Sequence, residues 1–143
     1  MSMLDINKGN SKKQFAKIIW VYVVLSLVAI IADKIYDIFG HGVDSPAMTW
    51  MFLYPLLGGA LFYLIINMLF PHINGNHGFR GFFNMHNSGV ATLNFASFLK
   101  GVFEIAGTSS SYLKYYYVVG CLFIVVGVIN LIIVVINKNK VHQ

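Results

Sequence analysis

Charged residues are scarce in this sequence, and their scarcity excludes most soluble folds. Only 10% of the 143 residues are charged, while 57% are hydrophobic, and the mean hydropathy is +0.70. Soluble domains average about 25% charged and about 45–50% apolar residues. The composition therefore predicts an integral membrane protein.

Cysteine and catalytic motifs are also missing or nearly so. The single cysteine, Cys121, lies in an apolar run and has no partner for an intramolecular disulfide. The chain contains no HExxH, CxxC, GxSxG, GxGxxG or Walker motif. Its five histidines do not recur at helical spacing as metal ligands would. We therefore expect no enzyme, no cofactor and no metal.

The net charge of +5 raises the question of nucleic-acid binding. The cations gather near the two ends of the chain, beside apolar runs, and no basic stripe is interleaved with aromatic residues. The anionic inner surface of a lipid bilayer is the better partner for such a pattern. We expect a bilayer partner and no nucleic acid.

Four apolar stretches reach the length of about 20 residues that a membrane crossing needs. They cover residues 15–39, 46–70, 83–107 and 112–136, with tails at 1–14 and 137–143. The basic start followed by an apolar run also fits a signal peptide, but the run is too long and lacks a small-residue exit site. We predict an all-α fold: one polytopic domain, 1–143, forming a four-helix transmembrane bundle with short loops.

The distribution of basic residues predicts the orientation of this bundle. With both tails in the cytosol, seven basic residues lie inside and three outside. Cytoplasmic loops are enriched in Lys and Arg, so this count favours an N-in/C-in topology. The inner residues are Lys8, Lys12, Lys13, Lys17, Arg80, Lys138 and Lys140, and the outer ones are Lys34, Lys100 and Lys114.

The third stretch carries most of the polar residues found inside an apolar span. At about 100° per residue they fall within about 140° of one another, so they share one face of a helix. Asn94 lies near mid-span, where it is either a ligand or permeation contact or an interhelical hydrogen-bonding group, for instance to Ser26. The candidate polar face consists of Asn87, Asn94, Ser97, Lys100 and Glu104.

Acidic residues gather toward the predicted outer surface. Asp33, Asp37 and Glu104, together with His41, form a candidate outer acidic cluster that could bind a cation, an amine or a proton. The alternative is structural, because Lys100 and Glu104 are four residues apart and can pair on a helix. KIYDIFG at 34–40 and GVFEIAG at 101–107 match in their residue types, and a duplication of two helical hairpins would make Asp37 and Glu104 equivalent.

Small residues and prolines mark the expected helix contacts. Ser45 and Pro46 have the residue types of an N-cap and a first helical position. Proline allows a kink in a membrane helix, and small residues allow a second helix to approach closely. The candidate packing residues are Ser26, Pro55, Gly58, Gly59, Gly120 and Gly127.

Two segments carry a family resemblance. At HGVDSPAMTW (41–50) and NSGVATLNFASFLKGVFEIAGTSS (87–110) the chain resembles uncharacterised small four-span membrane proteins of low-GC Gram-positive bacteria. The resemblance implies a location in the bacterial plasma membrane, and it implies no activity.

Two classes of function follow from the sequence. The first is a non-enzymatic binding, regulatory or accessory protein that acts on a larger membrane-protein partner. The second is a small-solute or ion transporter or channel subunit that works as a homo-oligomer, with Asn94, Ser97, Lys100 and Glu104 along a hydrated path.

Overall fold

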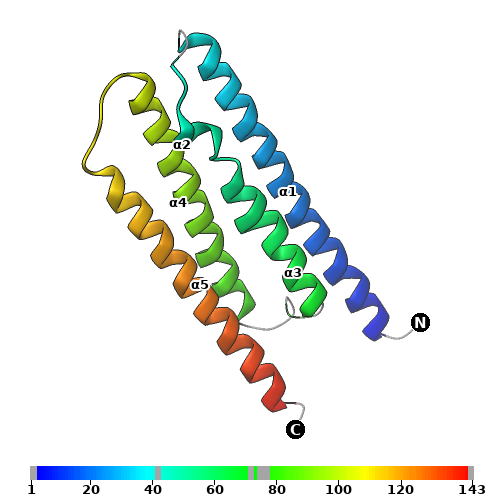
Figure 1. Ribbon diagram of the computed structural model, residues 1–143. Helices are drawn as coiled ribbons and strands as arrows, with labels where there is room; N and C mark the ends of the chain where they lie inside the picture. The colour runs from blue at the N-terminus through cyan, green and yellow to red at the C-terminus, as the bar shows by residue number, and fades with distance from the viewer. Residues whose placement is uncertain (1–2, 41–42, 71–72, 74–77, 142–143) are drawn as a thin grey trace.

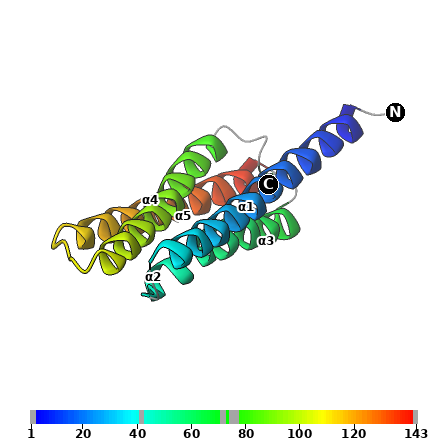
Figure 2. The same ribbon diagram turned by 90° about the horizontal axis from the view of Figure 1, so that it is seen from above.

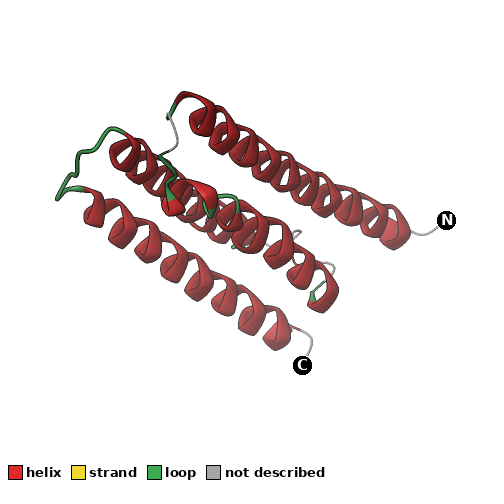
Figure 3. Cartoon of the chain, turned by 45° about the horizontal axis from the view of Figure 1, so that its top comes forward, coloured by secondary structure: helices red, strands yellow, loops and turns green. Residues whose placement is uncertain are grey.

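Helices make up nearly all of the molecule, and the described residues contain no strand (Figure 3). The structure, a computed structural model, describes residues 3–40, 43–70, 73 and 78–141. The predicted all-helical fold is confirmed for these residues. The elements are α1 (Met3–Phe39), α2 (Pro46–Thr49), the π-helix η1 (Tyr54–Leu61), α3 (Phe62–Leu69), α4 (Phe79–Ile105) and α5 (Leu113–Val141).

The helices pair in the order of the chain as two hairpins. α1 packs along η1 and α3, and α4 packs along α5. The hairpins meet mainly where α4 contacts α2 and η1. Both chain termini lie toward one end of the bundle, and the turns after α1 and α4 lie toward the other (Figures 1 and 2).

Three segments are long and apolar enough to cross a membrane, which supports the predicted membrane protein. They are Lys12–Phe39, Pro46–Leu69 and Leu113–Asn137. The predicted third span corresponds to α4, which is 27 residues long. α4 is not among the three because its His, Asn, Ser, Thr and Lys residues lower its mean hydropathy.

Helices α1, α4 and α5 extend beyond the predicted spans. The predicted polar tail 1–14 is helical from Met3 onward, α4 begins at Phe79 instead of 83, and α5 continues to Val141. Extending an existing helix gains one hydrogen bond per residue without a new nucleation cost, so the helices continue past the apolar runs.

The second predicted span is broken instead of continuous. Ser45 caps α2, as predicted: its Oγ accepts a hydrogen bond from the Met48 N–H at 3.3 Å, and Pro46 follows it. α2 ends after one turn, and the chain continues through turns into η1, whose second residue is Pro55. Proline has no N–H and clashes with the preceding turn, which accounts for an irregular helix at this position.

Buried side chains form two clusters. The larger one lies in the half of the bundle that contains the termini and includes Phe15, Tyr22, Tyr63, Phe82 and Val134. The smaller one contains Ala29, Met48 and Met51, nearer the turns. Most large apolar residues on the outer faces of α1 and α5 are exposed, as expected for helices that contact lipid.

Close approaches at glycine hold α4 against α5 and α1 against η1. A Cβ at Gly89 would lie 2.8 Å from the Gly120 carbonyl oxygen, and a Cβ at Gly127 would lie 3.0 Å from the His86 backbone nitrogen. A Cβ at Gly59 would lie 2.0 Å from the ring of Tyr22. Backbones that come this close maximise van der Waals contact, the main attraction between helices in a bilayer.

Candidate functional site

Asn87 on α4 links three helices through one side-chain oxygen. Its Oδ1 accepts hydrogen bonds from the hydroxyls of Tyr22 on α1 and Tyr63 on α3, each at 2.6 Å. The rings of Tyr22 and Tyr63 are stacked, with centroids 5.8 Å apart. These contacts fix the amide of Asn87 and satisfy two hydroxyls that would be costly to leave unpaired inside a bilayer.

His86, the residue before Asn87, joins α4 to the π-helix. Its Nε2 lies 2.7 Å from the Gly58 carbonyl oxygen. Since a carbonyl only accepts, Nε2 carries the proton of this hydrogen bond. The imidazole stacks on Phe62 at a centroid distance of 4.2 Å. Its other nitrogen, Nδ1, is buried and has no hydrogen-bond partner among the described residues.

Ser97 and Glu104, both on α4, contact residues at the start of α2. Ser97 Oγ donates to the Ala47 carbonyl oxygen at 2.7 Å. Ser45 Oγ donates to Glu104 Oε2, and Lys100 Nζ lies 3.7 Å from Glu104 Oε1. These residues of the candidate polar face therefore hold α4 against α2.

Asn94 differs from the other residues of that face. Its Oδ1 is buried without a hydrogen-bond partner in the described part of the chain. The predicted bond to Ser26 is wrong: Ser26 Oγ donates instead to the Tyr22 carbonyl of its own helix at 2.8 Å. A hydroxyl one turn away on the same helix is always within reach of that carbonyl, so the local bond prevails.

A groove of about 780 Å³ runs between α1 and α4, and Asn94 lies in its wall. It is open along one side, since Val28 and Phe95, which both line it, are 54% and 52% exposed. Its wall is mainly apolar, and its size is in the usual range of ligand sites, about 300–1,000 Å³. Its polar wall residues are Lys17, Tyr22, Asn87 and Asn94, and Met51 and Pro55 also line it.

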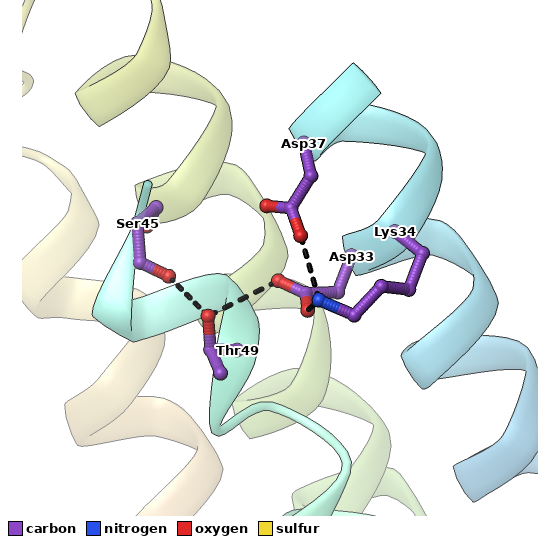
Figure 4. Close-up of polar contacts among 5 residues, drawn as sticks. All are labelled: Asp33, Lys34, Asp37, Ser45 and Thr49. Carbon is purple, nitrogen blue, oxygen red and sulfur yellow. Dashed lines mark hydrogen bonds and ion pairs between the residues drawn. The ribbon is translucent and has the colours of Figure 1, made fainter. Parts of the chain in front are cut away.

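The acidic residues are divided between two groups. Asp33, which is buried, accepts a hydrogen bond from Thr49 Oγ1 at 3.2 Å and lies 3.5 Å from Lys34 Nζ (Figure 4). Asp37 pairs with the same Lys34 at 2.7 Å (Figure 4), whereas Glu104 is held by Ser45 and Lys100.

Asp33 and Asp37 of the predicted outer cluster therefore share Lys34, while Glu104 pairs with Lys100 on its own helix. No group of three or more His, Cys, Asp or Glu residues that could hold a metal occurs within the described ranges. His41, the fourth predicted member, lies outside the described residues.

Two features of the site were not anticipated from the sequence. The first is the pair of tyrosines on Asn87, although Tyr22 does share the α1 face that also carries Ser26. The second is the groove, which depends on how far apart the hairpins sit. Helical spacing on both walls was its only sequence signal: residues 18, 21, 25, 28 and 32 on α1, and residues 83, 87, 90, 94 and 98 on α4.

Comparison with protein-family models, curated proteins and solved structures found no match to this chain.

Proposed function

We propose that the protein is a non-enzymatic membrane protein that binds a transmembrane helix of a larger membrane-protein partner in the α1–α4 groove. The observation that carries the proposal is Asn94, whose buried Oδ1 has no partner among the described residues although it lies in the groove wall. An unpaired polar group in hydrocarbon costs several kcal/mol. If the half-buried amide turns toward the groove, a hydroxyl or amide on a partner helix satisfies this oxygen, whereas a lipid tail has no donor to offer.

The proposal includes four membrane spans with both tails in the cytosol of a plasma membrane. α4, at 27 residues, is about 40 Å long and thus sufficient for a crossing. His86, Asn87 and Ser97 bond to neighbouring helices, which offsets the cost of burying them. The basic-residue count supports the orientation, and the resemblance to small bacterial membrane proteins supports the location.

The second candidate is a transporter or channel subunit in a homo-oligomer. It is favoured by the presence of Lys17 as well as Asn94 in the groove, since a second copy facing the groove would enclose a path lined by both. It has less support, because Ser97, Lys100 and Glu104, the other residues expected along a path, do not line the groove. Ser97 and Glu104 bond to residues 47 and 45 instead.

Photo-crosslinking from within the membrane tests the proposal. A benzoyl-phenylalanine placed at Phe95, in the groove wall, should form an adduct with one defined membrane protein. The same probe at Val125, exposed on α5, should not. Asn94→Leu should abolish the adduct while leaving the protein at least as stable, because it removes an unpaired buried amide.

Three results would speak against a partner helix. Adducts with lipid alone from position 95 would contradict it, as would an adduct that is unchanged in Asn94→Leu. An adduct between two copies of the chain would favour the homo-oligomeric transporter or channel instead.

A further inference from the structure

The end of the bundle that contains the termini carries positive charge on both α1 and α4, the two helices that wall the groove. Lys17 on α1 lines the groove and is exposed. Arg80 on α4 is also exposed. Arg80 precedes Asn87 by seven residues, so the two lie within about 20° of each other around the helix. Arg80 therefore continues the groove-lining stripe of Phe83, Asn87 and Asn94 by one turn.

This end has little negative charge to balance these cations. The sequence contains no acidic residue from 6 to 32 or from 45 to 103, and Asp5 precedes Lys17 by more than three turns of α1. The acids Asp33, Asp37 and Glu104 pair with Lys34 and Lys100 nearer the opposite end. Neither Lys17 nor Arg80 forms an ion pair with another described residue.

Two further features add to the positive potential. Lys13, also exposed, lies one turn before Lys17, about 40° around α1. α4 begins beside Arg80 with Gly78 at the N-cap position, which provides no side-chain cap. The N-terminus of a long helix carries a partial positive charge and exposed N–H groups, which favour a phosphate oxygen.

We infer that Lys17 and Arg80 form a binding site for the phosphate group of an anionic phospholipid at the mouth of the α1–α4 groove. Charge complementarity assigns this ligand: Lys17 lines one wall of the groove, and Arg80 continues the stripe of α4 that lines the other, at the level where apolar helix surface gives way to polar residues. The lipid's acyl chains would lie against Val21 and Leu25, which line the groove near Lys17 and are about half exposed. Arg80 lies about four turns of α4 from Asn94, so its contact with the phosphate does not depend on what occupies the groove near Asn94.

Native mass spectrometry of the full chain, released from detergent with added lipid, tests this site. Phosphatidylglycerol should bind more tightly than phosphatidylcholine, and the preference should weaken as salt rises. Lys17→Gln and Arg80→Gln should each reduce phosphatidylglycerol affinity about fivefold, and the double variant about 25-fold, at about 1 kcal/mol per cation near the surface. Phosphatidylcholine binding should change little.

Lys12→Gln is the matched control. It removes the same charge from the same end of α1, but Lys12 lies about 140° around the helix from Lys17, so the lipid preference should persist. Lys17→Arg with Arg80→Lys should also retain the preference, and helicity by circular dichroism should be equal in all variants.

Two outcomes would overturn the site. One is a double glutamine variant that keeps the preference of the wild type or loses no more of it than Lys12→Gln. The other is displacement of phosphatidylglycerol by millimolar inorganic phosphate, which would identify a soluble phosphate as the ligand.

Discussion

Asn87 shows how much one side chain can contribute to a bundle with few polar contacts. Its Oδ1 receives two hydroxyl groups from two different helices at 2.6 Å. Tyr63 has no exposed surface, and Tyr22 is 7% exposed. Both hydroxyls would lose this acceptor together if the amide were removed, so the three residues should behave as a cooperative unit.

The first prediction follows from this unit. Asn87→Leu should destabilise the protein by about 2–4 kcal/mol, because it leaves two buried hydroxyls without an acceptor. Tyr63→Phe should cost only about 1 kcal/mol, since it deletes one donor and leaves Asn87 bonded to Tyr22. Unfolding in mixed micelles, followed by circular dichroism, measures both. An equal loss of unfolding free energy in the two variants would show that Asn87 is not the shared acceptor.

Residue types predicted some of these roles and missed others. Ser45 and Pro46 identify the N-cap of α2 because capping depends only on neighbouring residues. The partner of Ser26 could not be found in this way, because a serine in a helix can bond either locally or across to another helix. Asn87 and Asn94 also look alike in sequence, and only the structure shows that Asn87 Oδ1 accepts two hydroxyls while Asn94 Oδ1 has no partner among the described residues.

At the scale of elements, the contact between α1 and η1 depends on a missing side chain. Gly59 lies in the π-helix, and a Cβ there would lie 2.0 to 2.4 Å from three atoms of the Tyr22 ring. Real Cβ atoms do not come so close, so either the ring or the helix would have to move. The hydroxyl of Tyr22 also donates a hydrogen bond to Asn87 on α4. Movement of the ring would therefore disturb the contact between α1 and α4 as well.

The second prediction compares two glycine substitutions. Gly59→Ala should destabilise the protein by about 1–3 kcal/mol through overpacking against Tyr22. Gly81→Ala, in the first turn of α4, has nothing within 4 Å of the added Cβ and should stabilise it by about 0.5–1 kcal/mol through higher helix propensity. Thermal unfolding in detergent distinguishes them. If Gly59→Ala unfolds at the same temperature as the wild type, then Gly59 and the Tyr22 ring are not in close contact, and α1 lies farther from η1 than the 2.0 Å distance implies.

Helix positions were predictable to within a few residues where the apolar runs are long. The start of α1 and the end of α5 were not, because polar residues continue a helix once it has formed. The break between α2 and η1 was also missed: Pro55 predicts a kink, but the sequence does not distinguish a simple kink from a turn followed by a π-helix.

At the scale of the whole molecule, charge is distributed unevenly along the bundle. Lys17 and Arg80, which form no ion pair with another described residue, lie toward the end with the termini. The acids Asp33, Asp37 and Glu104 lie near the ends of α1 and α4, where the chain turns. Such a distribution favours one orientation in a membrane with an anionic inner leaflet.

The third prediction concerns this orientation. In a background with Cys121→Ser, a single cysteine at Ser110 should react with an impermeant thiol reagent added to intact cells. A single cysteine at Gly78 should react only after the membrane is permeabilised. Labelling of position 78 in intact cells would reverse the proposed N-in/C-in topology, and labelling of both positions would mean that α4 does not cross the bilayer.

The pairing of α1 with η1 and α3, and of α4 with α5, also bears on biosynthesis. Each hairpin has its own internal contacts, and the two are joined by the chain between Phe70 and Gly78. The ribosome could therefore deliver the first hairpin to the membrane as a finished unit before α4 is synthesised. Assembly of the protein would then reduce to a single docking event between two preformed halves, and the open groove would mark the part of their boundary that docking leaves unsealed.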